Sequence, residues 1–232
     1  MALKLAIMGA MPEEIEPLLK RVGKYTTTKY AKNTYYEASY AGIDLVIAYS
    51  KIGKVFSTLT ASTMIHHFGV ETMLFSGVAG GINPKLKIGD MIVAKDLCQH
   101  DLDITAFGHP HGFVPGGSQF VKTDEALCEL AFEVATELKI PLIEGTIATG
   151  DQFVHSPERK AFIESTFNAD ALEMEGSSVA VVCHSMNVPV FILRAISDTA
   201  DTDASFSFEE FMVSSAKISA SFIMKMVEKL AR

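Results

Sequence analysis

Two carboxylates separated by one residue stand out in the stretch Ala-Leu-Glu-Met-Glu-Gly at 171–176. If this stretch is extended, Glu173 and Glu175 point to one side, with Met174 opposite or at the edge. The residues that follow are small and apolar, which is typical of a buried helix, so carboxylates at its entrance are costly unless they bind something. A solvated turn before that helix is the alternative, and the pattern favours a functional pair.

Further charged residues stand where predicted strands end. Arg194 and Asp198 flank the end of an apolar run, where they could serve a site or could pair with each other to support the sheet edge. For Glu14 the residues favour a structural interpretation over a functional one, because acidic side chains in a first helical turn commonly offset the positive end of the helix. The residues alone leave both questions open.

Several other kinds of site are disfavoured. The stretch Gly-Val-Ala-Gly-Gly at 77–81 is neither a dinucleotide fingerprint nor a P-loop, although its glycines allow a flat ligand to approach the backbone closely. His109 and His111 have no carboxylates at a matching spacing, which argues against a metal site. Neither a nucleophile elbow nor a cysteine–histidine signature is present.

Composition sets the broad class. The 232 residues, 48% of them apolar, suit one domain over 1–232 with a full core. A net charge of −8 argues against a nucleic-acid surface, no stretch is apolar for long enough to span a membrane, and the N-terminus lacks the long apolar region of a secretion signal. Cys98, Cys128 and Cys183 are odd in number and widely spaced, which argues against disulfides and zinc. A cytoplasmic protein is predicted.

Apolar runs alternate with amphipathic segments along the chain, which predicts a largely parallel sheet covered on both faces. Ligands of such sheets bind at the carboxyl ends of the strands, where the candidate residues lie. Strands are expected at 3–10, 45–52, 72–82, 90–99, 142–154 and 188–198, helices after Pro12 and at 53–69, 124–140, 156–167, 177–186 and 207–232, and a loop at 106–120.

Seven motifs in order, covering nearly the whole chain, resemble the nucleoside phosphorylase/hydrolase superfamily and, within it, the methylthioadenosine/S-adenosylhomocysteine nucleosidases. The resemblance implies a three-layer α/β/α sandwich with a mixed, partly barrel-like central sheet, and a homodimer. The motifs are IMGAMPEEI (7–15), SKIGKV (50–55), SGVAGGI (76–82), HDLDITAFG (100–108), TGDQFV (149–154), ALEMEGSSVA (171–180) and RAISDTAD (194–201).

The resemblance also implies roles for individual residues. Glu14 corresponds to the general base that activates water, Asp198 to the general acid at purine N7, and Glu175 to the carboxylate that holds the ribose hydroxyls. The other expected substrate-binding residues are Met174 and the strand-end residues Val78, Ala79 and Gly80 at the sugar and base; Glu173, Arg194 and Ser197 in support; Phe153 and the Val154 backbone at adenine; Met11, Ile52 and Phe208 around the 5′ substituent; and Phe107 and Pro115 from the partner subunit.

The implied chemistry is hydrolysis of an N-glycosidic bond. Protonation at N7 turns adenine into a neutral leaving group, so the acid, Asp198, must carry a proton near neutral pH. Glu14 and Glu175 would stabilise the positive charge that develops on the ribose, and neither a metal nor another cofactor is required. The expected substrates are 5′-methylthioadenosine and S-adenosylhomocysteine, with 5′-deoxyadenosine and 6-amino-6-deoxyfutalosine, a menaquinone precursor, as further substrates.

Two alternatives differ in what they require. A phosphorylase of the same superfamily needs cationic partners for phosphate, whereas Glu13 and Glu14 follow the first strand and Val78 replaces the serine of many relatives. A catalytically silent nucleoside-binding module is expected to lack the acid and the base, which are both present. The sequence therefore favours a hydrolase.

Overall fold

The strands form one mixed sheet in the computed structural model, which describes residues 3–198 and 208–231. Their hydrogen-bonded order is β10-β6-β8-β9-β5-β1-β4-β3-β2, and β7 pairs with β6. The strands are β1 (Lys4–Gly9), β2 (Thr26–Tyr30), β3 (Asn33–Tyr40), β4 (Ile43–Tyr49), β5 (Thr72–Gly81), β6 (Met91–Gln99), β7 (Val121–Lys122), β8 (Leu142–Thr149), β9 (Ala171–Glu173) and β10 (Val190–Asp198).

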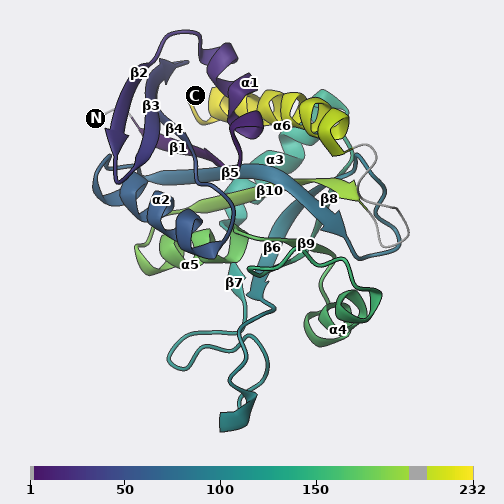
Figure 1. Ribbon diagram of the computed structural model, residues 1–232. Coiled ribbons are helices and arrows are strands. Elements are labelled where there is room, and N and C mark those ends of the chain that lie inside the picture. The colour runs from purple at the N-terminus through teal and green to yellow at the C-terminus, as the bar shows by residue number, and fades with distance from the viewer. Residues whose placement is uncertain (1–2, 199–207, 232) are drawn as a thin grey trace.

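Part of this sheet closes on itself. The long strand β5 pairs with β9 through its last residues and also with β10, so that β5, β10, β6, β8 and β9 form a ring of five strands. Strands β1, β4, β3 and β2 extend the sheet away from that ring (Figure 1). The mixed, partly barrel-like sheet is therefore confirmed.

Helices cover both faces of the sheet (Figure 1). In β1, Leu5 and Ile7 pack in a core with α1, α3 and α6, whereas Ala6 and Met8 pack in a second core with α2 and α5. This alternation follows from the two-residue period of a strand. The three-layer α/β/α arrangement is thus confirmed, and its helices are α1 (Pro12–Val22), α2 (Lys54–His66), α3 (Glu125–Leu138), α4 (Pro157–Phe167), α5 (Gly176–Ser185) and α6 (Phe208–Leu230).

The expectation of a largely parallel sheet is wrong in part, because five of the ten strand pairings in the described residues are antiparallel. Three of these five pairings involve barrel strands: β10 with β6, β5 with β9, and β6 with the short strand β7. The other two belong to the β2–β3–β4 meander, whose first two strands the sequence analysis did not predict. Strand β2 lies at the sheet edge with largely exposed side chains, so it lacks the apolar signal of a buried strand.

The segment between β6 and β7 is a loop, as predicted. It contains one short 3₁₀ helix, η1 (Thr105–Phe107), and projects from the body of the molecule (Figure 1). Among the described helices, none is long and apolar enough to cross a membrane.

Candidate active site

A cavity of about 140 Å³ lies at the carboxyl ends of β1, β5, β9 and β10. It brings together segments that are up to 188 positions apart in sequence, from Ala10 to Asp198. Ala10 and Leu172 line it although the sequence analysis did not single them out. The predicted residues that line it are Met11, Glu14, Ile52, Val78, Ala79, Gly80, Phe153, Glu173, Met174, Glu175, Ser197 and Asp198.

Glu14 is buried in the first turn of α1, with 4% of its surface exposed. Its carboxylate accepts hydrogen bonds from the backbone N–H of Ala10 at 2.6 Å, of Met11 at 3.0 Å and of Val78 at 3.3 Å. Burial raises the pKa of Glu14, while Arg194 and these N–H groups act in the opposite direction. A carboxyl group whose pKa is raised toward neutrality is suited to accept a proton.

The neighbouring strand leaves room for this carboxylate only because residue 77 is glycine. A Cβ atom on Gly77 would lie 2.8 Å from Glu14 Oε1 and 3.3 Å from a nitrogen of Arg194. Any side chain there would have to displace the carboxylate.

Arg194 is the buried cation beside these acids, with 1% of its surface exposed. Its Nη2 donates to Glu173 Oε2 at 2.7 Å, and its guanidinium lies 4.1 Å from the ring centre of Phe75. Arg194 therefore pairs with Glu173 and not with Asp198, which answers the question that the sequence left open.

Glu173 is held by a network that includes one residue the sequence analysis missed. Thr149 donates its hydroxyl to Glu173 Oε1, and the backbone N–H groups of Glu175 and Gly176 donate to Oε2 at 3.2 and 2.7 Å. Thr149 Oγ in turn accepts from the N–H of Ser177 at 2.7 Å. Thr149 is the first residue of the motif TGDQFV, but the sequence analysis assigned no role to it.

Glu175 lies beside Glu173, but not for the reason predicted. Strand β9 ends at Glu173, and Glu175 forms the N-cap of α5 with φ −137° and ψ −35°. A turn, and not strand alternation, therefore brings the two carboxyl groups together. Glu175 is also buried and accepts the N–H of Gly53 at 2.8 Å. Burial, and then the charge of Glu173, raise the pKa of Glu175 to about 8.

Asp198 faces this cluster from the end of β10. Ser197 donates its hydroxyl to Asp198 Oδ1 at 2.7 Å, as an orienting residue would. Lys160 of α4, which the sequence analysis missed, places its ammonium 3.9 Å from Oδ2. Glycine at residue 80 provides space for the Asp198 carboxyl group, because a Cβ atom there would lie 3.1 Å from Asp198 Oδ2.

The remaining predicted residues lie outside this cavity. Arg194 acts from behind Glu173, and Val154 lines a neighbouring hollow that it shares with Phe153. Phe107 of η1, 81% exposed, and Pro115, also exposed, lie on the projecting loop. The side chain of Phe208, at the start of α6, is outside the described residues.

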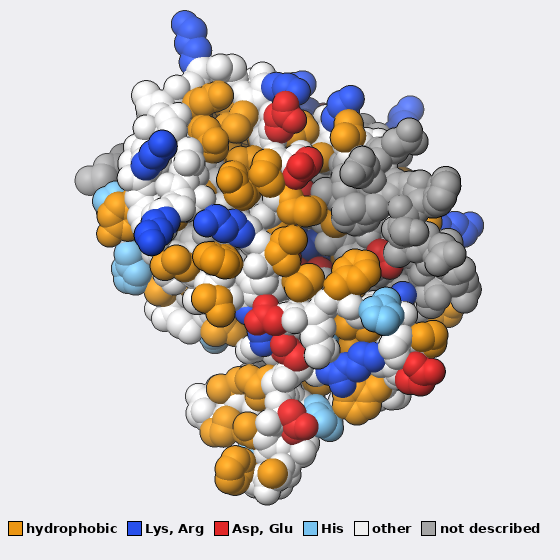
Figure 2. Space-filling model, viewed as in Figure 1, with side chains coloured by type: hydrophobic (Ala, Val, Ile, Leu, Met, Phe, Trp, Pro, Cys, Tyr) orange, Lys and Arg blue, Asp and Glu red, His pale blue; other side chains and the backbone are white. Residues whose placement is uncertain are grey.

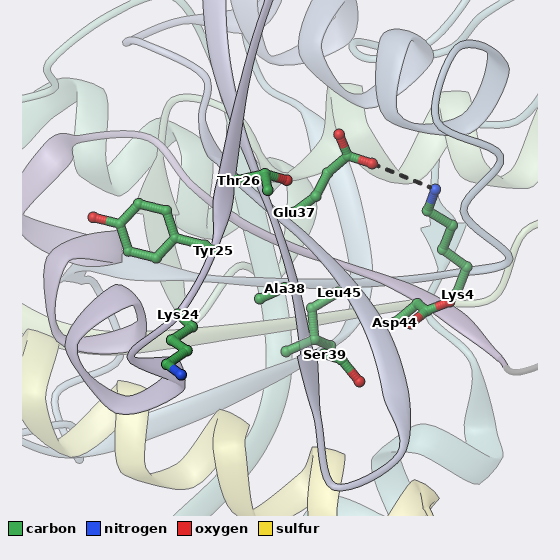
Figure 3. A pocket seen from close by; sticks show the side chains of 9 residues that line it. All are labelled: Lys4, Lys24, Tyr25, Thr26, Glu37, Ala38, Ser39, Asp44 and Leu45. Carbon is green, nitrogen blue, oxygen red and sulfur yellow. Dashed lines mark ion pairs between the residues drawn. The ribbon is translucent and has the colours of Figure 1, made fainter.

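A larger hollow, of about 450 Å³, lies at the opposite ends of β1 and β4 (Figure 3). Lys4 and Glu37 form an ion pair of 3.8 Å across it, and Lys24, Tyr25 and Asp44 contribute further to its mixed polar lining. It contains none of the predicted site residues and lies at the amino ends of parallel strands, where ligands of such sheets seldom bind.

No group of three or more His, Cys, Asp and Glu side chains in 3–198 and 208–231 is arranged to hold a metal ion.

Comparison with known proteins agrees with this geometry. Residues 4–228 match the family model of the phosphorylase superfamily. An aminodeoxyfutalosine nucleosidase of Campylobacter jejuni is 60% identical, over 98% of this chain and 100% of its own. The chain belongs to the phosphorylase superfamily, within its nucleosidases.

One further relative and one solved structure are also similar to the chain along nearly its whole length. A 5′-methylthioadenosine/S-adenosylhomocysteine nucleosidase of Anoxybacillus flavithermus is 36% identical over 98% of this chain and 99% of its own. The crystal structure of a Campylobacter jejuni 5′-methylthioadenosine/S-adenosylhomocysteine nucleosidase has a TM-score of 0.97 and 59% identity, over 98% of this chain and 100% of that one. The similarity to these nucleosidases therefore includes every strand that lines the cavity.

The raised pKa of Glu175 makes the stability of this superfamily member depend on pH. Its folded-state pKa of about 8 lies above the ordinary 4.5, so the stabilisation from its neutral form is complete below pH 4.5 and is lost as pH rises through 8. Glu175→Gln stays neutral, so its free energy of unfolding should exceed that of the wild type increasingly from pH 5 to 8. We expect a change of about 1 kcal/mol or more, since one pKa unit corresponds to about 1.4 kcal/mol.

Urea unfolding at several pH values, without ligand, measures this difference. The control is Glu13→Gln, which changes an exposed acid one residue before Glu14 and should shift the curve equally at every pH. A constant difference between Glu175→Gln and the wild type would contradict the raised pKa.

Proposed function

We propose that the protein is an N-ribosyl hydrolase that cleaves the N-glycosidic bond of 5′-methylthioadenosine and S-adenosylhomocysteine. The observation that carries this proposal is the single cavity in which the oriented Asp198 faces the buried carboxyl groups of Glu14 and Glu175. Relatives named as nucleosidases for these substrates and for aminodeoxyfutalosine support it. We extend the proposal to 5′-deoxyadenosine and 6-amino-6-deoxyfutalosine.

In this mechanism Asp198 protonates purine N7 as the bond between N9 and C1′ breaks. The bonding electrons move to the base, which then leaves as neutral adenine. Ser197 holds one oxygen of Asp198, so that the other can face the purine. The ring of Phe153, which is 62% exposed at the mouth of this cavity, would stack on adenine.

The opposite side of the cavity acts on the sugar and on water. Glu14 takes a proton from the water that attacks C1′, and Glu175 accepts hydrogen bonds from the ribose hydroxyls. Hydroxyl donors favour the ionised form of Glu175, which then stabilises the oxocarbenium-like transition state. Met174 lies against the sugar, and Met11 and Ile52 supply an apolar wall for the 5′ substituent. Each methylene buried there contributes about 0.8 kcal/mol.

A phosphorylase reaction fits the same cavity poorly. None of its described lining residues is Arg or Lys, and the group that faces the sugar from α1 is the carboxylate of Glu14. An entering phosphate would therefore meet like charge, with no Arg or Lys in the described lining to compensate it.

The first test is to incubate the pure protein with methylthioadenosine in phosphate-free buffer and to measure adenine and free 5-methylthioribose. We expect both products at a rate that added phosphate leaves unchanged. Release that depends on phosphate and yields the ribose 1-phosphate would instead identify a phosphorylase.

The proposed acid predicts a specific loss in Asp198→Asn. The amide can still hydrogen-bond the substrate but has no acidic proton, so turnover should fall by roughly 10²–10⁴-fold. Substrate binding, measured by calorimetry, should be retained. Asp44→Asn is the matched control, because Asp44 is an exposed aspartate at the amino end of β4. Full turnover by Asp198→Asn would exclude the acid role.

We also propose that the active form is a cytoplasmic homodimer. Ile52, Val55, Phe56 and Leu59 expose 45–74% of their surfaces around α2, and Phe107 exposes 81% on the projecting loop. Figure 2 shows hydrophobic side chains on this face and on that loop. Apolar patches of this kind are typical of protein interfaces. Residues from the partner subunit, Phe107 and Pro115, would then complete the wall of the 5′ pocket, together with Phe208.

Phe107→Ser tests this completion. Light scattering should give a dimer mass for the wild type, and the variant should raise KM for methylthioadenosine about tenfold, which corresponds to about 1.4 kcal/mol of lost binding. Val213→Ser is the control, since Val213 is a 51% exposed apolar residue on α6. A monomeric wild type with full activity would rule out a shared site.

A further inference from the structure

A second, very small cavity lies behind Glu14, on the side of α6. Its volume is about 10 Å³, and its lining comes from α1, β5 and α6. Glu14 and Val78 line both this cavity and the substrate cavity. The proposed base therefore separates the two spaces. The remaining lining residues of the small cavity are Ser76, Gly77, Ser215, Ala216 and Ser219.

Three of these residues bring hydroxyl groups into the interior. Ser76 has 2% of its surface exposed, and Ser215 and Ser219 have 4% each. On the same helix the hydroxyls of Ser214 and Ser221 bond backbone carbonyl groups of the preceding turn, at 2.9 and 3.0 Å. The hydroxyls of Ser215, Ser219 and Ser76 make no such bond to the residues that the structure describes. Hydroxyl groups that line an internal cavity without protein partners indicate an ordered water.

The space and its polar groups suit one water molecule. A water needs about 10–15 Å³ of such volume and two to four hydrogen-bonding partners. The three serine hydroxyls and the Glu14 carboxyl group can supply up to four such partners. An apolar filling is disfavoured, because it would leave the Glu14 carboxylate with only its backbone donors in a site that already costs solvation.

We propose that this cavity holds one water molecule, bound by Ser76, Ser215 and Ser219, which donates a hydrogen bond to Glu14 and so keeps the base ionised and oriented. The inference rests on the proposed function, which makes Glu14 the base. A donor to the charged form favours that form, and so lowers the pKa of the carboxyl group relative to dry burial. The serines are positioning residues, since they act on the reaction through Glu14.

The other charged groups around Glu14 come from the remaining elements packed against it. Arg194 of β10 favours its ionised form, whereas the charge of Glu175 at the start of α5 opposes it. The part of α6 that lines the small cavity contributes no charge, and Lys217 lies on the exposed side of the helix. A change at Ser215 therefore leaves the charged groups around Glu14 in place.

The test combines crystallography with a pH profile. A wild-type crystal structure at high resolution should show one water within hydrogen-bond distance of Glu14 and of the α6 hydroxyls. Ser215→Val fills the space with methyl groups, displaces the water and should move the acidic limb of kcat/KM for methylthioadenosine upward by about one pH unit. On the plateau, where the base is ionised in both proteins, kcat should change less than about twofold.

Two further variants make the result specific. Ser214→Val places the same side chain on the exposed side of α6 and should leave the profile unchanged. Ser215→Ala keeps the space but removes one partner of the water; it should shift the limb less, and it serves if the valine variant does not fold.

Each outcome decides the question. An empty cavity in the wild-type crystal, or an unshifted limb after the water has been displaced, would overturn the inference. If the wild type releases no adenine at any pH, the proposed function fails instead, and the crystal structure alone still decides whether the water site exists.

Discussion

Arg194 is the one cation that the structure places among the three carboxyl groups of Glu14, Glu173 and Glu175, and the rest of the site depends on that imbalance. Arg194 forms its close ion pair with Glu173, which leaves Glu14 and Glu175 without a full counter-charge. Ionising all three acids would leave two uncompensated negative charges in a region that water barely reaches. Burial and the missing counter-charge therefore raise the pKa values of Glu14 and Glu175, which makes Glu14 better able to accept a proton from water in the place where a glycosidic bond is to be cleaved.

The site tolerates this imbalance of charge because backbone N–H groups also stabilise the carboxylates. Glu14 is held by three N–H groups and Glu175 by that of Gly53. Such donors stabilise charge without bringing a second positive side chain, which would lower the pKa values and remove the basis for acid–base chemistry. The pair of Glu173 and Arg194 in turn fixes the turn into α5, since the Glu173 carboxylate accepts the first N–H groups of that helix. The hydrogen bonds of Glu173 thus both balance its charge and hold the turn into α5.

The sequence predicted the elements better than their connections. Apolar periodicity located the helices and the buried strands, but the β2–β3 hairpin has an exposed face and gave no such signal. Antiparallel closure of the barrel could not follow from local patterns, because β5 pairs with a strand far along the chain. Gly80 pairs with Leu172, 92 positions away, and Gly81 pairs with Ala171, 90 positions away. The barrel-like sheet was predicted only from the resemblance of the motifs to a family whose fold is known.

The same distinction explains the site. Motifs identified most of the residues that line the cavity, because the chemistry limits them to a few residue types. They included Thr149 without a role and did not include Lys160. The contacts of these two residues form only once the strand ends and α4 come together around Glu173 and Asp198. Glycines at the strand ends make that meeting possible, since a Cβ atom at residue 77 or 80 would occupy the space of a carboxylate. Glycines at the end of β5 leave space for carboxyl groups that come from other elements, Glu14 from α1 and Asp198 from β10. The sequence of β5 shows that side chains are absent there, but it does not show which carboxyl group occupies the space.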